Sequence, residues 1–208
     1  WPSGMGRGVG ARRSILLSLP PPMHPQLDEY RTGFVDLQDE ATALVTDADA
    51  ATMRRRPDPD AWSVVQCIDH LNTAGWLLLR AMEDEIRRGR AEGPYGTPPF
   101  EYGVVSRWFA HVLEPSSGWT FDAPSLFEPD APNTLYPNEA VDEFLGLQDR
   151  FADCVGDAEG LDLRRIRFGS PAIPLLRISL GAWFEATLAH ERRHLDQARR
   201  TLRALHSS

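Results

Sequence analysis

Residues 176–205 read LRISLGAWFEATLAHERRHLDQARRTLRAL. Apolar side chains recur in this stretch at intervals of three, four or seven residues: Leu180, Phe184, Leu188, Leu195, Ala198, Leu202 and Leu205. This spacing places them along one face of a helix with 3.6 residues per turn. The stretch therefore predicts a long amphipathic helix that buries this face in a core.

Three further stretches have the same character, at about residues 25–52, 64–88 and 138–155. The second of them has a start signal, because Ser63 can cap the helix and Gln66 follows three residues later, as in a capping box. No segment shows a convincing strand alternation. Four long amphipathic helices around one core predict an all-α protein, a four-helix bundle.

The second and third of these helices are separated by a long connection, residues 89–137. Proline, glycine, serine and aromatic residues dominate it, as in Gly93-Pro94-Tyr95-Gly96-Thr97-Pro98-Pro99. A short helix is expected at about residues 104–113. Ordered loops of this length more often line functional sites than span empty space. We therefore expect a long crossover connection that contributes to a site.

The chain is long enough for one domain of ordinary size. Residues 1–24 are expected to form a flexible leader, with Met23 as an alternative natural start, and residues 25–208 a single helical domain. Two cysteines far apart, Cys67 and Cys154, exclude a disulfide scaffold and favour a reducing cytoplasm. We expect both to pack as small apolar residues. No apolar run is long enough to cross a bilayer.

The formal net charge is −8 and the sequence pI is about 5.2. A nucleic-acid-binding protein needs a basic face to displace counterions from phosphates, and this balance argues against one. It argues equally against adhesion to an anionic membrane. All 22 basic residues are arginine, which we attribute to the codon bias of a GC-rich bacterial genome.

Three histidines indicate a metal site. His190 and His194 are one helical turn apart, so both imidazoles leave the same side of the last helix, where they can bind one ion. His70, at the edge of the apolar face of the second helix, is the best third ligand. Three histidine ligands leave positions open for water or substrate, as in catalytic sites. A pair of histidines on an arginine-rich helix can also be two ordinary surface residues that bind no metal.

The same residues, His190-Glu191-Arg192-Arg193-His194, also fit the H-E-x-x-H pattern of zinc proteases. Its extended form is absent, because Gln197 stands where glycine is required and Arg200 where the third histidine is required. No accompanying sheet is predicted either. We therefore regard a protease as the weaker interpretation.

Two segments together resemble a known family. Residues 60–71, DAWSVVQCIDHL, resemble the W-S-x-x-(E/Q)-x-x-x-H-L opening of the second helix in DinB-like proteins. Residues 189–200, AHERRHLDQARR, resemble the H-x-x-x-H-x-x-Q pattern of that family's last helix. The resemblance covers roughly residues 26–205. It implies a DinB-like four-helix bundle with a long crossover between helices two and three, and it matches His70, His190 and His194 to the family's metal ligands.

The resemblance also implies an activity. Family members bind zinc, nickel, iron or manganese, and some transfer a low-molecular-weight thiol. We therefore expect one divalent metal ion and a metal-dependent thiol transferase or hydrolase acting on a small molecule. The alternatives are a non-catalytic metal-binding or stress-related bundle, and a helical interaction domain that binds no metal. Gln66, Asp69 and Gln197 are candidate partners of the imidazoles. An exposed apolar stripe on the bundle would support a homodimer.

Overall fold

The computed structural model describes residues 22–46, 48–114, 127–169 and 175–207. Its four long helices are α1 (Pro25–Thr46), α3 (Val64–Glu92), α5 (Pro137–Asp157) and α6 (Leu180–His206). The smaller elements are α2 (Ala50–Arg54), α4 (Val104–Leu113), β1 (Arg167–Phe168) and β2 (Ile178–Ser179). The predicted leader lies outside the described residues up to position 21.

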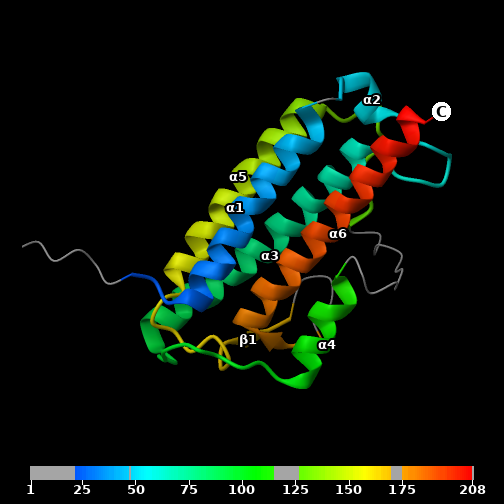
Figure 1. Cartoon of the computed structure of the whole chain (residues 1–208). Coiled ribbons are helices and arrows are strands. Elements are labelled where there is room, and N and C mark those ends of the chain that lie inside the picture. Colours follow the sequence, from blue (N-terminus) through cyan, green and yellow to red (C-terminus); the bar gives the residue numbers. More distant parts are fainter. Residues whose placement is uncertain (1–21, 47, 115–126, 170–174, 208) are drawn as a thin grey trace, which may run out of the picture.

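The four long helices form one bundle (Figure 1). Helices α1 and α6 run in one direction, and α3 and α5 run in the opposite direction. Each of α1 and α3 packs against both α5 and α6. Helix α3 ends at one end of the bundle and α5 begins at the other, and the connection between them contains α4, which packs on α6. The predicted all-α bundle with a long crossover is confirmed.

The start of α3 follows the predicted capping box. The hydroxyl of Ser63 accepts a hydrogen bond from the backbone N–H of Gln66, and Oε1 of Gln66 accepts from the backbone N–H of Ser63 at 3.2 Å. These two bonds satisfy backbone donors that a helix start leaves without intrahelical partners. The helix is therefore anchored two turns before His70.

Three predicted helix limits were wrong. The second long helix was expected to end at about residue 88, but α3 continues to Glu92. The first helix was expected to reach residue 52, but α1 ends at Thr46, and the carboxylate of Asp49 caps α2 by accepting from the N–H of Thr52 at 2.7 Å. This local bond competes with continuation of the helix. The last helix was expected from about residue 176, but Ile178 and Ser179 pair with β1 in an antiparallel ladder, and α6 begins at Leu180.

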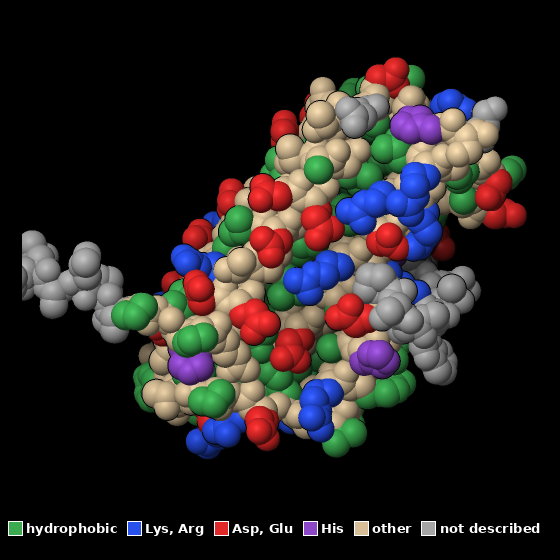
Figure 2. All heavy atoms as spheres, in the orientation of Figure 1, with side chains coloured by type: hydrophobic (Ala, Val, Ile, Leu, Met, Phe, Trp, Pro, Cys, Tyr) green, Lys and Arg blue, Asp and Glu red, His purple; other side chains and the backbone are tan. Residues whose placement is uncertain are grey.

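The core lies between the four long helices and is rich in aromatic rings. The rings of Phe34 and Phe151 stack with centroids 4.8 Å apart, and Phe184 meets Phe34 edge-on. Cys67 and Cys154 are buried free thiols, as expected. Figure 2 shows acidic and basic side chains interspersed over the face formed by α1 and α6. None of the helices among the described residues has the length and apolar character of a membrane span.

Gly75 allows α3 to approach α5 closely. A Cβ atom at this position would lie 2.5 Å from Cδ2 of Leu147, a side chain with no exposed surface. Gly146, in the middle of α5, is exposed and has no neighbour within 4 Å of such an atom. The two glycines therefore form a matched pair.

We predict that Gly75→Ala lowers the free energy of unfolding by about 1–2 kcal/mol, because overpacking outweighs the gain in helix propensity. Gly146→Ala should raise it by about 0.5–1 kcal/mol. Urea unfolding followed by circular dichroism measures both. Equal stabilisation by the two substitutions would show that α3 and α5 are not in close contact at Gly75.

Candidate metal centre

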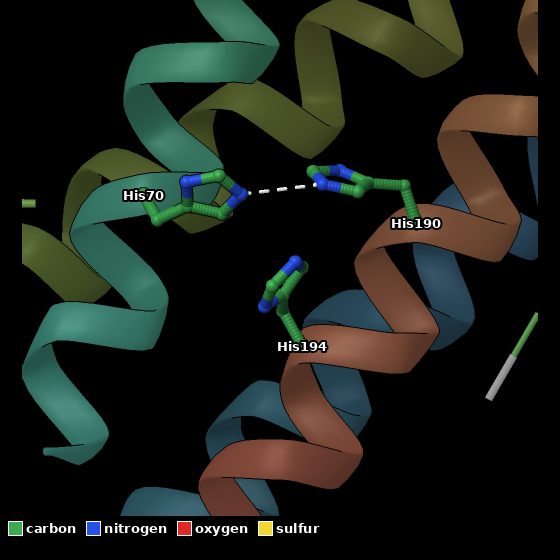
Figure 3. A group of neighbouring side chains, drawn as sticks. All are labelled: His70, His190 and His194. Atoms are coloured by element: carbon green, nitrogen blue, oxygen red, sulfur yellow. Dashed lines mark hydrogen bonds between the residues drawn. The ribbon is translucent and has the colours of Figure 1, made fainter. Parts of the chain in front are cut away.

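Helices α3 and α6 bring the three predicted histidines together (Figure 3). His70 comes from the second turn of α3, and His190 and His194 come from successive turns of α6. The two helices run antiparallel and pack against each other, so residues 120 positions apart in the chain face one another. His190 and His194 leave the same side of α6, as their spacing predicts.

The ligand atoms of the three rings all lie within 4.8 Å of one another. Nε2 of His70 and Nε2 of His190 are 3.2 Å apart, shown as the dashed line in Figure 3. Two nitrogens bound tetrahedrally to one ion at 2.0–2.1 Å would be about 3.3 Å apart. The spacing of this pair therefore fits a shared metal ion.

Hydrogen bonds hold two of the rings in the tautomer that a metal requires. Nδ1 of His70 lies 2.7 Å from the carbonyl oxygen of Phe127, and Nδ1 of His194 lies 3.0 Å from Oε1 of Gln197. Both oxygens accept, so both Nδ1 atoms carry the proton and both Nε2 lone pairs are free. Without a metal, the Nε2–H of His190 donates to His70. To bind a metal through Nε2 as a neutral ring, His190 would carry its proton on Nδ1 instead.

All three imidazoles are held in the neutral form. Burial lowers the pKa of His70. Burial, reinforced by His194 and His70, lowers the pKa of His190 well below its ordinary value. Burial and the neighbouring His70 lower the pKa of His194 to about 3. Neutral imidazole is the form that binds metals, so the protein itself favours the competent state.

An indole ring forms one wall of the cluster. Trp62, in the segment before α3, stacks on His194 with centroids 5.8 Å apart and an interplanar angle of 23°. Its ring centroid is 5.1 Å from that of His70. The hydroxyl of Thr201 donates to the backbone oxygen of Trp62 at 3.2 Å, which fixes this wall to α6.

The three predicted imidazole partners differ in what they contact. Gln197 lies at His194, as described above. Asp69 accepts a hydrogen bond from the backbone N–H of Asp130. Gln66 serves the helix cap and donates to the backbone oxygen of Asp130. The contacts of Asp69 and Gln66 are therefore with the crossover and not with an imidazole.

Two further contacts of the rings were not predicted as such. Trp62 belongs to the motif that carries the family resemblance, so its place near the histidines could have been predicted from that motif. The Phe127 contact is made by a backbone carbonyl, which every residue has. No side-chain pattern in the crossover could have revealed it.

Glu191 does not belong to the histidine cluster. Among the described residues, the group of ligand atoms within 4.8 Å contains the three histidines and no carboxylate. The side chain of Glu191 is 1% exposed and lies beside Gln148 of α5, and burial raises its pKa to about 8. The carboxylate therefore lies in the core of the bundle. This position excludes the zinc-protease arrangement, in which the glutamate faces the metal-bound water.

Two clefts lie between α1 and α6, away from the histidines. Their volumes are about 470 and 380 Å³, and both are lined by Glu29 and Arg192. Neither is lined by a histidine of the triad. Residues 115–126 of the crossover, which was expected to line the site, lie outside the described residues.

Comparison with known proteins identifies a family. Residues 34–198 match the family described as the DinB superfamily. The match includes all three histidines and extends from α1 into α6. No curated protein and no solved structure gives a significant match. Since the match covers most of the chain, the protein belongs to the DinB superfamily.

Proposed function

We propose that this protein binds one divalent metal ion through His70, His190 and His194. The observation that supports the proposal is the convergence of three neutral imidazoles on one point, with the lone pairs of His70 and His194 freed by hydrogen bonds at their Nδ1 atoms. Imidazole binds zinc, nickel, copper and iron alike, so the donor set admits several metals. Zinc, nickel, iron and manganese are the ions to test first.

The arrangement favours a catalytic site over a structural one. Structural zinc sites are closed by four protein ligands, whereas catalytic sites use three and leave a position open. The cluster contains three ligand side chains among the described residues. His190 and His194 keep partial exposure to solvent, so a small molecule can approach from their side.

The residues in and around the histidine cluster would contribute to metal binding in different ways. The three histidines hold the ion, and Phe127 and Gln197 orient two of the rings through their Nδ1 protons. Trp62 covers the faces of His70 and His194 and keeps water from that side. The bound metal would lower the pKa of a coordinated water or thiol and so supply a hydroxide or thiolate near neutral pH.

We infer that the substrate is a small molecule and that the reaction is thiol transfer or hydrolysis. Some members of the DinB-like family transfer a low-molecular-weight thiol, which supports thiol transfer. The net charge of −8 disfavours nucleic acid as a substrate. The alternative is a metal-binding bundle without turnover. A screen of thiols with electrophiles on the metal-loaded protein distinguishes the two.

We predict that the protein expressed without a His-tag retains metal close to one equivalent per chain, and that His194→Ala loses most of it. Removal of one of three ligands leaves two, which hold an ion weakly. Inductively coupled plasma mass spectrometry measures the content. His111→Ala, an exposed histidine on α4, is the matched control and should retain the metal.

Absence of metal in the wild-type protein after purification and after reconstitution with zinc, nickel, iron and manganese would refute the proposal. Equal loss in the His111→Ala control would show that the metal is held nonspecifically by surface histidines.

We predict that zinc affinity changes by less than about tenfold between pH 7.5 and pH 5.5. Protons compete with the metal for the same nitrogens, and the lowered pKa values of all three histidines move this competition below the ordinary pKa of 6.5. A peptide of residues 186–198, whose histidines are exposed, should lose affinity by about tenfold per pH unit for each protonated ligand below pH 6.5.

Competition with a chromophoric chelator at several pH values measures both affinities. If the protein loses affinity as steeply as the peptide from pH 6.5 downward, the imidazoles are not held neutral by the fold.

A further inference from the structure

The end of the crossover is fastened to the first two turns of α3. The amide of Gln66 donates to the backbone oxygen of Asp130 at 3.0 Å, and the backbone N–H of Asp130 donates to Oδ2 of Asp69 at 3.1 Å. Nδ1 of His70 donates to the backbone oxygen of Phe127 at 2.7 Å. One short segment, Phe127–Asp130, therefore contacts three side chains near the start of α3.

The three hydrogen bonds between α3 and the Phe127–Asp130 segment depend on one another. Asp69 and His70 follow Gln66 by three and four residues along α3, so each lies next to Gln66 on the helix surface. Asp130 is held through both its N–H and its carbonyl group. Phe127 is three residues away, so holding Asp130 keeps the Phe127 carbonyl within the roughly 10 Å that three residues can span. The bonds at Asp130 therefore restrict where the acceptor that orients His70 can lie.

We propose that docking of the Phe127–Asp130 segment on α3 is energetically coupled to metal binding at the triad, with Asp69 as a positioning residue. The inference rests on the proposed function. When the segment is docked, the Nδ1–H of His70 donates to the carbonyl oxygen of Phe127. The proton therefore stays on Nδ1, and the lone pair of Nε2 is free for the metal. A metal on Nε2 makes the Nδ1 proton a stronger donor and tightens the same bond. Such coupling acts equally in both directions.

Asp69 can affect metal binding in two ways, through its hydrogen bond to Asp130 and through its negative charge, and the test must distinguish them. Its carboxylate interacts electrostatically with His70, so a negative charge alone could increase the affinity for a cation. Asp69 is not in the cluster of ligand atoms. Asn at this position keeps an oxygen that accepts from the N–H of Asp130 and removes the charge. Ala removes both.

The test compares Asp69→Ala, Asp69→Asn and Asp84→Ala in the full chain. Asp84 is an exposed carboxylate on the same helix, paired with Arg87, and serves as the matched control. Zinc affinity is measured by chelator competition. Asp69→Ala should bind zinc roughly fivefold or more weakly than the wild type, while Asp69→Asn and Asp84→Ala should stay within about twofold.

The reverse direction of the coupling is read from hydrogen exchange by NMR. Zinc should slow exchange of the Asp130 amide by roughly fivefold or more in the wild-type protein and leave it unchanged in His194→Ala. The amide of Asp162, which donates to Pro94 in another loop, is the internal reference and should change much less. This measurement needs no substitution at Asp69, so it decides the matter even where Asp69→Ala fails to fold.

Three results would overturn the inference. If wild-type protein binds zinc and folded Asp69→Ala binds it equally well, the segment is not coupled to the site, although the proposed metal function stands. If Asp69→Asn is as weak as Asp69→Ala, charge and not positioning is responsible. If the wild-type protein binds no metal, the proposed function fails, and this inference with it.

Discussion

Antiparallel packing of α3 against α6 is the constraint on which the candidate site depends. Each helix is a rigid element whose apolar face is fixed in the core, so the polar edge of that face has little freedom to move. His70 and the pair His190 and His194 lie on these edges and meet in a partly buried space. Burial there removes the charge from all three rings. The same packing that stabilises the bundle therefore also prepares three neutral nitrogen ligands.

Most of the fold could be predicted because its information is local and periodic. A face of apolar residues at 3.6-residue spacing identifies a helix wherever it is long enough, and the capping box at Ser63 and Gln66 fixed one start to the residue. Helix ends were harder, because there a few hydrogen bonds compete. The first helix ends before its predicted limit, and Asp49 caps the separate helix α2 that follows. The last helix begins after its predicted start, because Ile178 pairs with Phe168 in a strand ladder. Both outcomes depend on bonds that a periodic pattern does not reveal.

The candidate site was predictable to the extent that its parts are side chains with restricted spacing. Two histidines one turn apart must share a side of a helix, and the third was indicated by the place of His70 at the edge of an apolar helix face and matched by the family resemblance. The partners that orient the rings were only partly accessible. Gln197 is one turn from His194 on the same helix, so its contact is local. The Phe127 carbonyl reaches His70 only after the crossover has returned to α3, a tertiary event without a side-chain signature.

Glu191 shows why a motif needs its structural setting. The letters H-E-x-x-H place two metal ligands and a carboxylate on one helix, but they do not determine what packs against each side. In this bundle the side with His190 and His194 faces α3, while Glu191 lies in the core beside Gln148 of α5. Burial raises the pKa of the carboxyl to about 8 and removes it from the metal-facing surface. Glu191 is therefore not placed to act as a general base at the proposed metal centre.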